Sequence, residues 1–233
     1  MPQKKARAKT SAVKKAGRPN KAPESTLNEN DAKQRLIESA TELFGEKGLD
    51  GVSTREIAQH CGLNISLISY YFGGKLGLYK GVLRAHMTKF TAAVSDVVTR
   101  GEKVKMTHQT LRESMTAILD NFLRMGESER HIFAIMTREK SMGMPHAASV
   151  HDEIVTPIAG KLIGMLAEAQ RQGIVRTDIN PHTFFILFFE SVFGFVTMSK
   201  CNLKLRKQAH QLPSQKEAFK NAVLDIFLKG ITK

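Results

Sequence analysis

Side chains able to catalyse a reaction or to bind a metal ion are few in this sequence, and their spacing is poor for either purpose. His146 and the run His151-Asp152-Glu153 fall in a stretch that we expect to be a loop, without the i, i+4 spacing that places two ligands on one helix face. Cys61 and Cys201 form no Cys-x-x-Cys pair. No Ser/His/Asp arrangement, phosphate-binding glycine loop or pair of catalytic carboxylates can be recognised. We therefore predict no catalytic residue, no bound metal and no cofactor.

The charge of the chain points instead to a polyanionic partner. Lysine and arginine number 35 against 22 acidic residues, which gives a formal net charge of +13 over 233 residues. Residues 1–23 contain no acidic residue and hold a cluster of basic ones: Lys4, Lys5, Arg7, Lys9, Lys14, Lys15, Arg18 and Lys21. This segment is also rich in Ala, Ser, Thr and Gly, which bury little apolar surface. We expect residues 1–27 to form a disordered basic tail.

Within this tail, Gly17-Arg18-Pro19 resembles an AT-hook, in which an arginine on a stiffened, extended segment enters a narrow A·T minor groove. Ala16 stands where such motifs usually carry another arginine. Arg18 is therefore a candidate minor-groove contact. The alternatives are loose phosphate contact by the tail and a purely solubilising role.

The rest of the sequence has a helical period almost throughout. We predict a first helix that starts near Asn28 and ends before Gly48, followed by helices over about 54–61, 65–71, 76–99, 108–125, 128–142, 152–172, 181–200 and 214–230. Pro157 lies only one turn into the 152–172 pattern, which places the start of that helix nearer to Pro157. No run of alternating strand residues is present. The predicted fold is all-α with about nine helices.

The segment STREIAQHCGLNISLISYYFGGK, residues 53–75, has the pattern of a helix-turn-helix. Ser53 and Glu56 have the spacing of a capping box, Ala58 is small enough for a close helix crossing, and Gly62 supplies a positive φ for the turn. The apolar positions that would seal this pair of helices onto the first helix are Ile57, Leu63, Ile68 and Phe72. The later helix of such a motif enters the DNA major groove. An ordinary helical hairpin is the alternative, but the basic tail favours DNA binding.

Residues 30–80 resemble the DNA-binding domain of the TetR family of bacterial transcriptional repressors. The likeness rests on the segments LIESATELFGEKGLDGVSTREIA, CGLNISLISYYFGGK and LGLY. It implies a helix-turn-helix domain over 28–76 and an effector-binding and dimerisation domain over 77–233. It also implies a homodimer, an operator with two-fold symmetry and a small molecule that lowers the affinity for DNA.

By position in the motif, the resemblance assigns eight residues to DNA contact. The expected contacts to the phosphate backbone are Thr54, Tyr70, Tyr71 and Lys75. The expected contacts to base edges, on the first turn of the recognition helix, are Asn64, Ile65, Ser66 and Leu67. Thr54 suits a phosphate because a helix N-terminus offers exposed amides beside its hydroxyl.

Two features depart from the usual pattern of the family. Ile65 and Leu67 stand where many relatives have polar residues, so they can contact thymine methyl groups but cannot form hydrogen bonds to bases. Ser69 stands where an aromatic residue is usual, so one contact is expected to be missing. The predicted readout therefore depends on Asn64, Ser66, apolar contact with thymine and DNA shape.

The predicted helix over 181–200 is apolar on nearly all sides and holds six of the 13 phenylalanines of the chain. Its most apolar stretch, Thr183 to Ser199, is short and contains Glu190, which argues against a membrane span. A helix of this kind is unsuited to the surface of a monomer. We expect one face to fill the subunit core and another to meet a second subunit. The resemblance to the TetR family implies that this contact is a four-helix bundle, to which the final helix contributes Phe219, Ala222 and Ile226.

A ligand pocket is expected among long apolar side chains of the middle helices, because such side chains adapt to varied hydrophobic ligands. The candidates are Met115, Leu119, Phe122, Met125, Phe133, Met136, Met165 and Phe188. Ordinary core packing is the alternative for each of them. Glu190 is a further candidate pocket residue. It is the only acidic residue in an apolar helix, and its carboxylate must therefore contact a basic partner, water or a cationic ligand group.

Together these features favour a homodimeric repressor, active in the cytoplasm on the nucleoid, that leaves a two-fold symmetric operator when a small hydrophobic ligand binds. The alternative is an architectural protein that prefers A·T-rich DNA and responds to no effector. Nothing in the spacing of residues favours an enzyme.

Overall fold

The computed structural model describes residues 28–101, 104–198 and 215–232, and within these ranges the chain forms nine helices and no strand. The predictions for the tail, Arg18 among them, and for Cys201 lie outside the described residues. The all-α prediction is confirmed. The only bridge of β type among the described residues pairs Val175 with Thr232, and there the Arg176 N–H donates to the Ile231 carbonyl at 2.8 Å.

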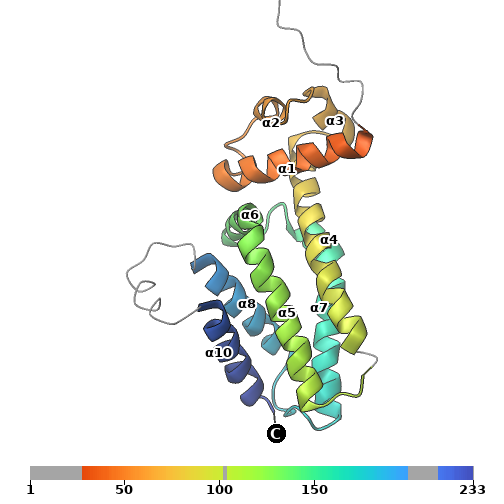
Figure 1. Cartoon of the computed structure of the whole chain (residues 1–233). Coiled ribbons are helices and arrows are strands. Elements are labelled where there is room, and N and C mark those ends of the chain that lie inside the picture. Colours follow the sequence, from red (N-terminus) through yellow and green to blue (C-terminus); the bar gives the residue numbers. More distant parts are fainter. Residues whose placement is uncertain (1–27, 102–103, 199–214, 233) are drawn as a thin grey trace, which may run out of the picture.

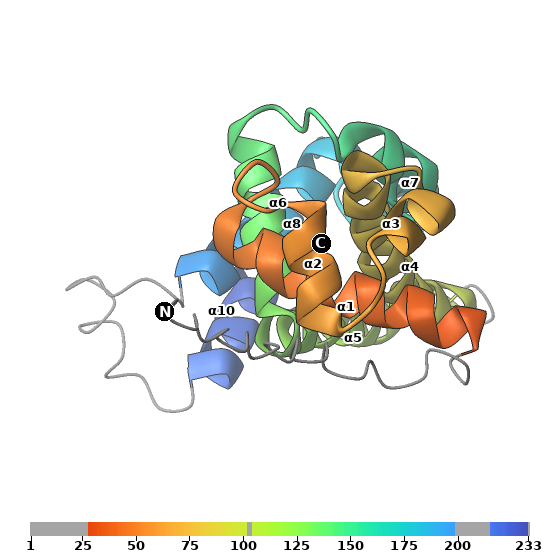
Figure 2. The same ribbon diagram turned by 90° about the horizontal axis from the view of Figure 1, so that it is seen from above.

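The described helices are labelled in Figure 1. They are α1 (Glu29–Lys47), α2 (Thr54–Cys61), α3 (Ser66–Phe72), α4 (Lys75–Gly101), α5 (His108–Ser128), α6 (Arg130–Ser141), α7 (Ala148–Arg171), α8 (Pro181–Met198) and α10 (Gln215–Lys229). The first three form a small unit at one end of the molecule, and α4 runs from that unit into the larger helical domain. Seen from above, α2 and α3 lie over α1 at the outer end (Figure 2).

Polar caps set several helix boundaries where the sequence predicts them. The Asn180 side chain accepts hydrogen bonds from the backbone of His182 and Thr183 at 2.9 and 3.2 Å, just ahead of Pro181 at the start of α8. Ser53 accepts from the Glu56 N–H at 3.1 Å. The Glu56 carboxylate forms an ion pair with Lys47, so that only one half of the predicted capping box is present.

The predicted start of the seventh helix near Pro157 is wrong. Helix α7 begins at Ala148, and Pro157 lies inside it. The turns before the proline are held by tertiary contacts, because Val150 is buried and Arg84 of α4 forms an ion pair with Glu153. These contacts offset the loss of one backbone hydrogen bond at the proline.

One hydrophobic core runs through the helix-turn-helix unit and the helical domain without a break. Phe44 of α1 lies edge-on to Tyr79 of α4, with ring centroids 5.1 Å apart. Farther down, Phe122 of α5 contacts both Phe133 of α6 and Phe189 of α8, at centroid distances of 5.7 and 5.8 Å. The two parts of the molecule are therefore packed as one body, and a displacement in one is felt in the other.

Glu139 of α6 is a fully buried carboxylate at the centre of this packing. It accepts hydrogen bonds from the Tyr79 hydroxyl at 2.9 Å and from the backbone N–H groups of His146 and Ala147 at 3.0 Å each. The His146 Nδ1 atom lies 3.1 Å from the same carboxylate. Glu139 thereby joins α6 to α4 and to the segment that leads into α7.

Burial alone raises the pKa of the Glu139 carboxyl, but the two backbone N–H donors and the Tyr79 hydroxyl outweigh burial and hold that pKa below its ordinary value. Burial and the same hydrogen bond raise the pKa of Tyr79. A carboxyl whose pKa is lower in the folded state stabilises the fold above its unfolded pKa and loses that contribution as pH falls through the folded value.

Replacing Glu139 by glutamine should lower the free energy of unfolding at pH 7 by about 2–4 kcal/mol, because an amide NH₂ would face buried N–H donors. Urea unfolding of the two proteins measures this difference. The difference should shrink below about pH 4.5 as the wild-type carboxyl protonates. Glu38→Gln, an exposed change on α1, is the control and should cost less than about 0.5 kcal/mol. Equal stability of wild type and Glu139→Gln at pH 7 would contradict the role of Glu139.

Candidate nucleic-acid interface

The turn between α2 and α3 depends on Gly62. Its φ is 68° and its ψ is 27°, in the left-handed region that favours glycine. The Gly62 N–H donates to carbonyls at the end of α2, and the Leu63 N–H donates to the Ala58 carbonyl at 2.9 Å. This turn sets the angle at which α3 leaves α2, as a helix-turn-helix requires.

Polar contacts from α1 fix α2 in place. The Arg35 guanidinium donates to the Cys61 carbonyl at 2.6 Å, at the C-terminus of α2. The Ser39 hydroxyl is 3.4 Å from the Ile57 carbonyl and 2.7 Å from His60 Nδ1. Because α1 is held in the core along its length, these bonds make α2 and α3 follow any movement of α1.

Helix α3 buries one side and presents the other to solvent. Ile68 is fully buried, whereas Ile65 is 45% and Tyr70 is 76% exposed. Ser66 and Ser69 are exposed on the same side. Leu67, which the sequence assigns to base contact, is partly buried and packs against the core, so it presents less of its side chain than Ile65.

The Asn64 side chain closes a turn just ahead of the recognition helix, whose N-cap is Ile65. The Asn64 side-chain oxygen accepts from the Ser66 N–H and from the Ser66 hydroxyl, each at 3.0 Å. The Asn64 NH₂ group and the lone pairs of the Ser66 hydroxyl are left for another partner. Those groups are the polar ones that the first turn of α3 offers to a base edge.

The two tyrosines differ in environment. Tyr70 projects into solvent and lies edge-on to Tyr71, with ring centroids 4.9 Å apart. Tyr71 packs against the core, and the Lys33 ammonium lies 5.0 Å from the centroid of its ring. Of the pair, Tyr70 is the freer to reach a DNA backbone.

The Lys75 ammonium points inward to the backbone of the α1–α2 connection. It donates to the Leu49 carbonyl at 2.9 Å and to the Val52 carbonyl at 3.0 Å. This geometry makes Lys75 a positioning residue that ties the start of α4 to the loop ahead of α2. Its predicted phosphate contact would have to use the one N–H left on the ammonium.

A basic residue that the sequence reasoning missed stands beside Thr54. Arg55, on the first turn of α2, is exposed and has no ion pair with another described residue. Thr54 itself is partly exposed at the first position of that helix. The signal available in the sequence was a basic side chain next to a helix N-terminus, which attracts phosphate.

The helical domain holds a small apolar cavity of about 20 Å³ between α5, α7 and α8, which is about the room one water molecule needs. Three of the predicted pocket residues line it, namely Met115, Met165 and Phe188. The other lining residues are Ile118, Leu162, Leu166, Pro181, Phe184, Phe185 and Phe189. No charged side chain is among them.

The remaining predicted pocket residues lie elsewhere. The structure places Leu119, Phe122, Phe133, Met125 and Met136 in or against the continuous core. Glu190 has the basic partner that its charge demands, because it forms an ion pair with Lys140 of α6. Its side chain is 55% exposed, so the pair lies at the surface.

Three consecutive residues of α6 connect the helix-turn-helix unit to α8. The Arg138 guanidinium donates to the carbonyls of Phe44, Gly45 and Glu46, at the C-terminal end of α1, over 2.8 to 3.0 Å. Glu139 is the buried carboxylate described above. Lys140 pairs with Glu190, and its ammonium lies 4.1 Å from the ring centroid of Phe193.

Comparison with known proteins agrees with this arrangement. Residues 36–82 match the family model described as bacterial regulatory proteins, tetR family. The chain is 29% identical over 107 residues to the probable HTH-type transcriptional regulator YttP of Bacillus subtilis, covering 46% of this chain and 49% of YttP. It is 25% identical over 151 residues to the HTH-type transcriptional dual regulator CecR of Shigella flexneri, covering 62% of this chain and 67% of CecR.

Residues 36–82 therefore carry a DNA-binding domain of the TetR type, in a chain that is similar to HTH-type transcriptional regulators. The matched segment spans about half the length of YttP. The fold extends further, since FadR from Bacillus subtilis, solved in complex with stearoyl-CoA, has a TM-score of 0.66 at 18% identity and covers 85% of this chain and 98% of that one. The chain therefore shares the fold of both of its domains with this solved structure.

Two substitutions separate the roles of its basic residues. Lys75→Met should lower the free energy of unfolding by about 1–3 kcal/mol, because two charge-assisted hydrogen bonds are lost. Arg55→Gln should leave stability within about 0.5 kcal/mol and reduce the slope of log affinity for DNA against log salt by about 0.9, the value for one phosphate contact.

Thermal melts and DNA titrations at several salt concentrations measure both effects. Lys75→Met could instead keep full stability and reduce the slope of log affinity against log salt by about 0.9. Lys75 would then be a phosphate ligand, and its proposed role in holding the start of α4 would be wrong.

Proposed function

We propose that this regulator is a homodimeric repressor that leaves a two-fold symmetric operator when a small hydrophobic ligand binds. The observation that carries the proposal is the continuous connection, through α6, between an exposed recognition face on α3 and the helix that lines an apolar cavity. The chain acts in the cytoplasm on the nucleoid, as a DNA-binding protein and not as an enzyme.

The apolar faces of α8 and α10 support the homodimer. Ile186 and Leu187 of α8 are each 57% exposed, and Ile226 of α10 is 70% exposed. By length and composition, α8 is also the one helix among the described residues that could cross a membrane. Its buried side chains Phe184 and Phe188 instead pack on Phe227 of α10, at centroid distances of 5.6 and 5.5 Å.

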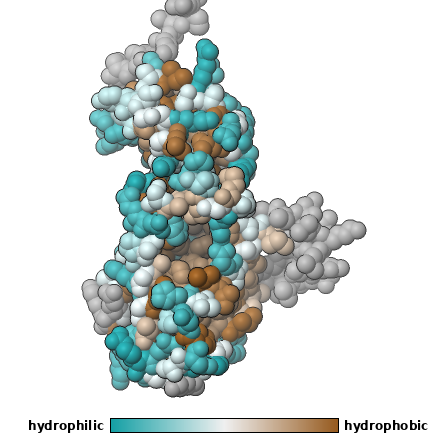
Figure 3. Space-filling model, turned by 180° about the vertical axis from the view of Figure 1, so that it is seen from behind, coloured by the Kyte–Doolittle hydropathy of each residue, from teal (hydrophilic) through white to brown (hydrophobic). Residues whose placement is uncertain are grey.

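A second copy of the chain is the partner that would cover these faces. Exposed apolar side chains of this size on two neighbouring helices are typical of an interface. Apolar side chains also reach the surface of the helical domain in the view from behind (Figure 3). Two subunits related by two-fold symmetry would present two α3 helices to successive major grooves, about 34 Å apart.

The cavity indicates the class of ligand. Its lining is apolar and rich in phenylalanine, with no charged group to bind a polar head. Such a lining suits a hydrocarbon chain or a fused ring, and the structural relative FadR was solved with stearoyl-CoA. A ligand of that size needs far more than about 20 Å³, so the helices around the cavity must separate when it binds.

The path of the coupling follows the ion pairs. Displacement of α8 moves Glu190 and Phe193, which act on Lys140. Because α6 is a rigid helix, Arg138 two residues earlier moves with Lys140 and shifts the end of α1. The recognition helices then lose the spacing of the operator. The ligand weakens DNA binding only by as much as it prefers the displaced state.

An architectural protein that prefers A·T-rich DNA is the second candidate function. The basic tail, with Gly17-Arg18-Pro19, favours it because such a tail needs no operator. The two candidates differ in what selects the DNA: α3 in the repressor and residues 1–23 in the architectural protein.

The dimer is tested by Leu187→Asp, which places a charge on the proposed interface. We expect analytical ultracentrifugation to give a dimer for the wild type and at least a tenfold weaker association for the variant, because burial of an unpaired carboxylate is costly. Met142→Asp is the matched control, since Met142 is 61% exposed and belongs to the α6–α7 connection, not to α8 or α10. A monomeric wild type, or equal weakening by both changes, would contradict the interface.

The operator is tested by selecting bound fragments from random and genomic DNA with the full chain and with a chain lacking residues 1–23. The repressor predicts one two-fold symmetric motif for both proteins, bound more weakly by the shorter chain. Saturated fatty acids and their acyl-CoA esters, the class suggested by the cavity, should then release that DNA. Arg138→Met should still bind the ligand, but the loss of DNA affinity that the ligand causes should be at least tenfold smaller than in the wild type.

Selection of A·T-rich fragments by the full chain alone, with none recovered by the shorter chain, would overturn the repressor in favour of the architectural protein.

A further inference from the structure

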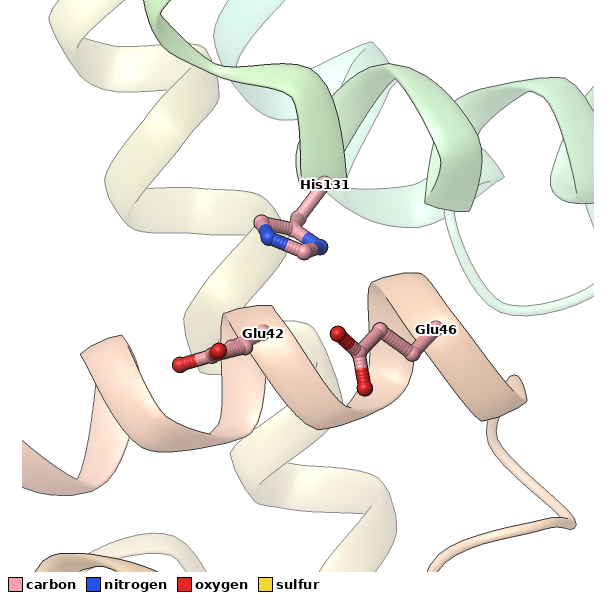
Figure 4. A group of neighbouring side chains, drawn as sticks. All are labelled: Glu42, Glu46 and His131. Atoms are coloured by element: carbon pink, nitrogen blue, oxygen red, sulfur yellow. The ribbon is translucent and has the colours of Figure 1, made fainter.

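We propose that the junction of α1 and α6 is a binding site for a divalent transition-metal ion, with Glu42, Glu46 and His131 as ligands and His60 as a fourth. Glu42 and Glu46 are one turn apart on α1, and His131 is on the first turn of α6. One ligand atom from each of these three lies within 4.8 Å of the others. Figure 4 shows the His131 ring extending from α6 over the two carboxylates.

The three side chains carry two negative charges and no fixed positive charge, and Arg130, which is hydrogen-bonded to His131, forms no ion pair with either carboxylate. Two carboxylates at i, i+4 on a helix repel each other. No lysine or arginine in the described ranges forms an ion pair with Glu42 or Glu46. Lys47, the nearest basic residue in sequence, pairs with Glu56, and Arg138 uses its guanidinium on backbone carbonyls. A bound cation would relieve this repulsion.

His60 offers a ring nitrogen toward the same place. The Ser39 hydroxyl lies 2.7 Å from His60 Nδ1, and the His60 Nε2 atom lies 3.9 Å from Glu42 Oε2. In the tautomer that is protonated on Nδ1, Nε2 has a lone pair available for a metal ion. A hydrogen bond to the other ring nitrogen is how proteins orient a metal-binding histidine.

Gly45 allows His131 to come this close. A Cβ atom at position 45 would lie 2.5 Å from the His131 Cβ and 2.8 Å from its Nδ1. Any side chain there would push α6 away from α1. His131 Nε2 accepts from the Arg130 Nε at 3.0 Å. Arg130 is exposed, so it can leave that nitrogen to an ion, or the ion can bind Nδ1.

Two imidazole nitrogens and two carboxylate oxygens are a donor set for Zn²⁺ and for Co²⁺ or Ni²⁺. In a tetrahedral zinc site, neighbouring ligand atoms are about 3.4 Å apart, given metal–ligand distances near 2.1 Å. The Glu42 side chain is about half exposed. Rotation of the two glutamate side chains would bring the ligand atoms to the distances that a bound ion requires. The ion would join α1 and α2 to α6, across the contact that Arg138 also makes.

The test is a Co²⁺ titration of the full chain without DNA, followed by the visible absorption of tetrahedral cobalt and by competition with Zn²⁺. We expect one saturable site per subunit. His131→Gln and Glu46→Gln should each weaken binding at least tenfold. His108→Gln and Glu38→Gln, one exposed histidine and one exposed carboxylate outside the cluster, are the controls and should bind as the wild type does.

Zn²⁺ should also raise the Tm of the wild type and of both controls but not of His131→Gln, since an ion bound only to the folded state stabilises it. Circular dichroism of each variant without metal checks that it is folded, and Glu46→Gln carries the test if His131→Gln is not. Absence of saturable binding below millimolar Co²⁺, or equal weakening by the controls, would overturn the proposal. Because no DNA is present, this result is independent of the proposed function.

Discussion

The buried carboxylate of Glu139 is the interaction on which the arrangement of this molecule depends. It accepts from the Tyr79 hydroxyl of α4 and from two backbone N–H groups ahead of α7. A buried carboxylate is tolerated only when its hydrogen bonds are complete, so any movement of α6 must carry Tyr79 and the His146–Ala147 backbone with it. Its neighbours Arg138 and Lys140 contact α1 and α8.

That constraint explains how one short helix can serve both domains. Successive residues of a helix point in different directions, about 100° apart. Arg138, Glu139 and Lys140 therefore contact three different parts of the molecule from one turn. The helix-turn-helix unit is a rigid extension of α1, because Arg35 and Ser39 bind the end of α2. The contact between α6 and α1 therefore helps to set the position of the recognition helix.

The motif was predictable because its determinants are local. The backbone at Gly62 has a positive φ, which favours glycine, and the Ser53 side chain accepts from the N–H of a residue three positions later. Ile68 is apolar at a position of the motif that is buried. Each of these signals lies within a few residues of the structure that it determines. The same holds for the helix limits at Gly48 and Asn180, which the sequence predicts correctly.

Other assignments depended on partners far away in the chain. Lys75 looks like any basic residue beside a DNA-binding motif, but the carbonyls of Leu49 and Val52 lie within its reach only after folding. Pro157 predicts a helix that starts close to it. The helix instead starts at Ala148, where an ion pair between Glu153 and Arg84, 69 residues earlier, helps to hold its first turns. The sequence does not distinguish the residues that line the cavity from the residues of the core, because both sets consist of the same kinds of apolar side chain.

The sequence by itself determined the all-α fold, the helix-turn-helix, the apolar character of α8 and the need of Glu190 for a partner. Periodicity, caps and a positive φ are properties of short segments, and an acid in an apolar helix is costly wherever it is buried without a partner. Only the tertiary structure decided that Lys140 is that partner, that α6 joins α1 to α8, and that Glu42, Glu46 and His131 meet, with His60 beside Glu42. These depend on how helices pack, which is settled by the fit of many side chains at once.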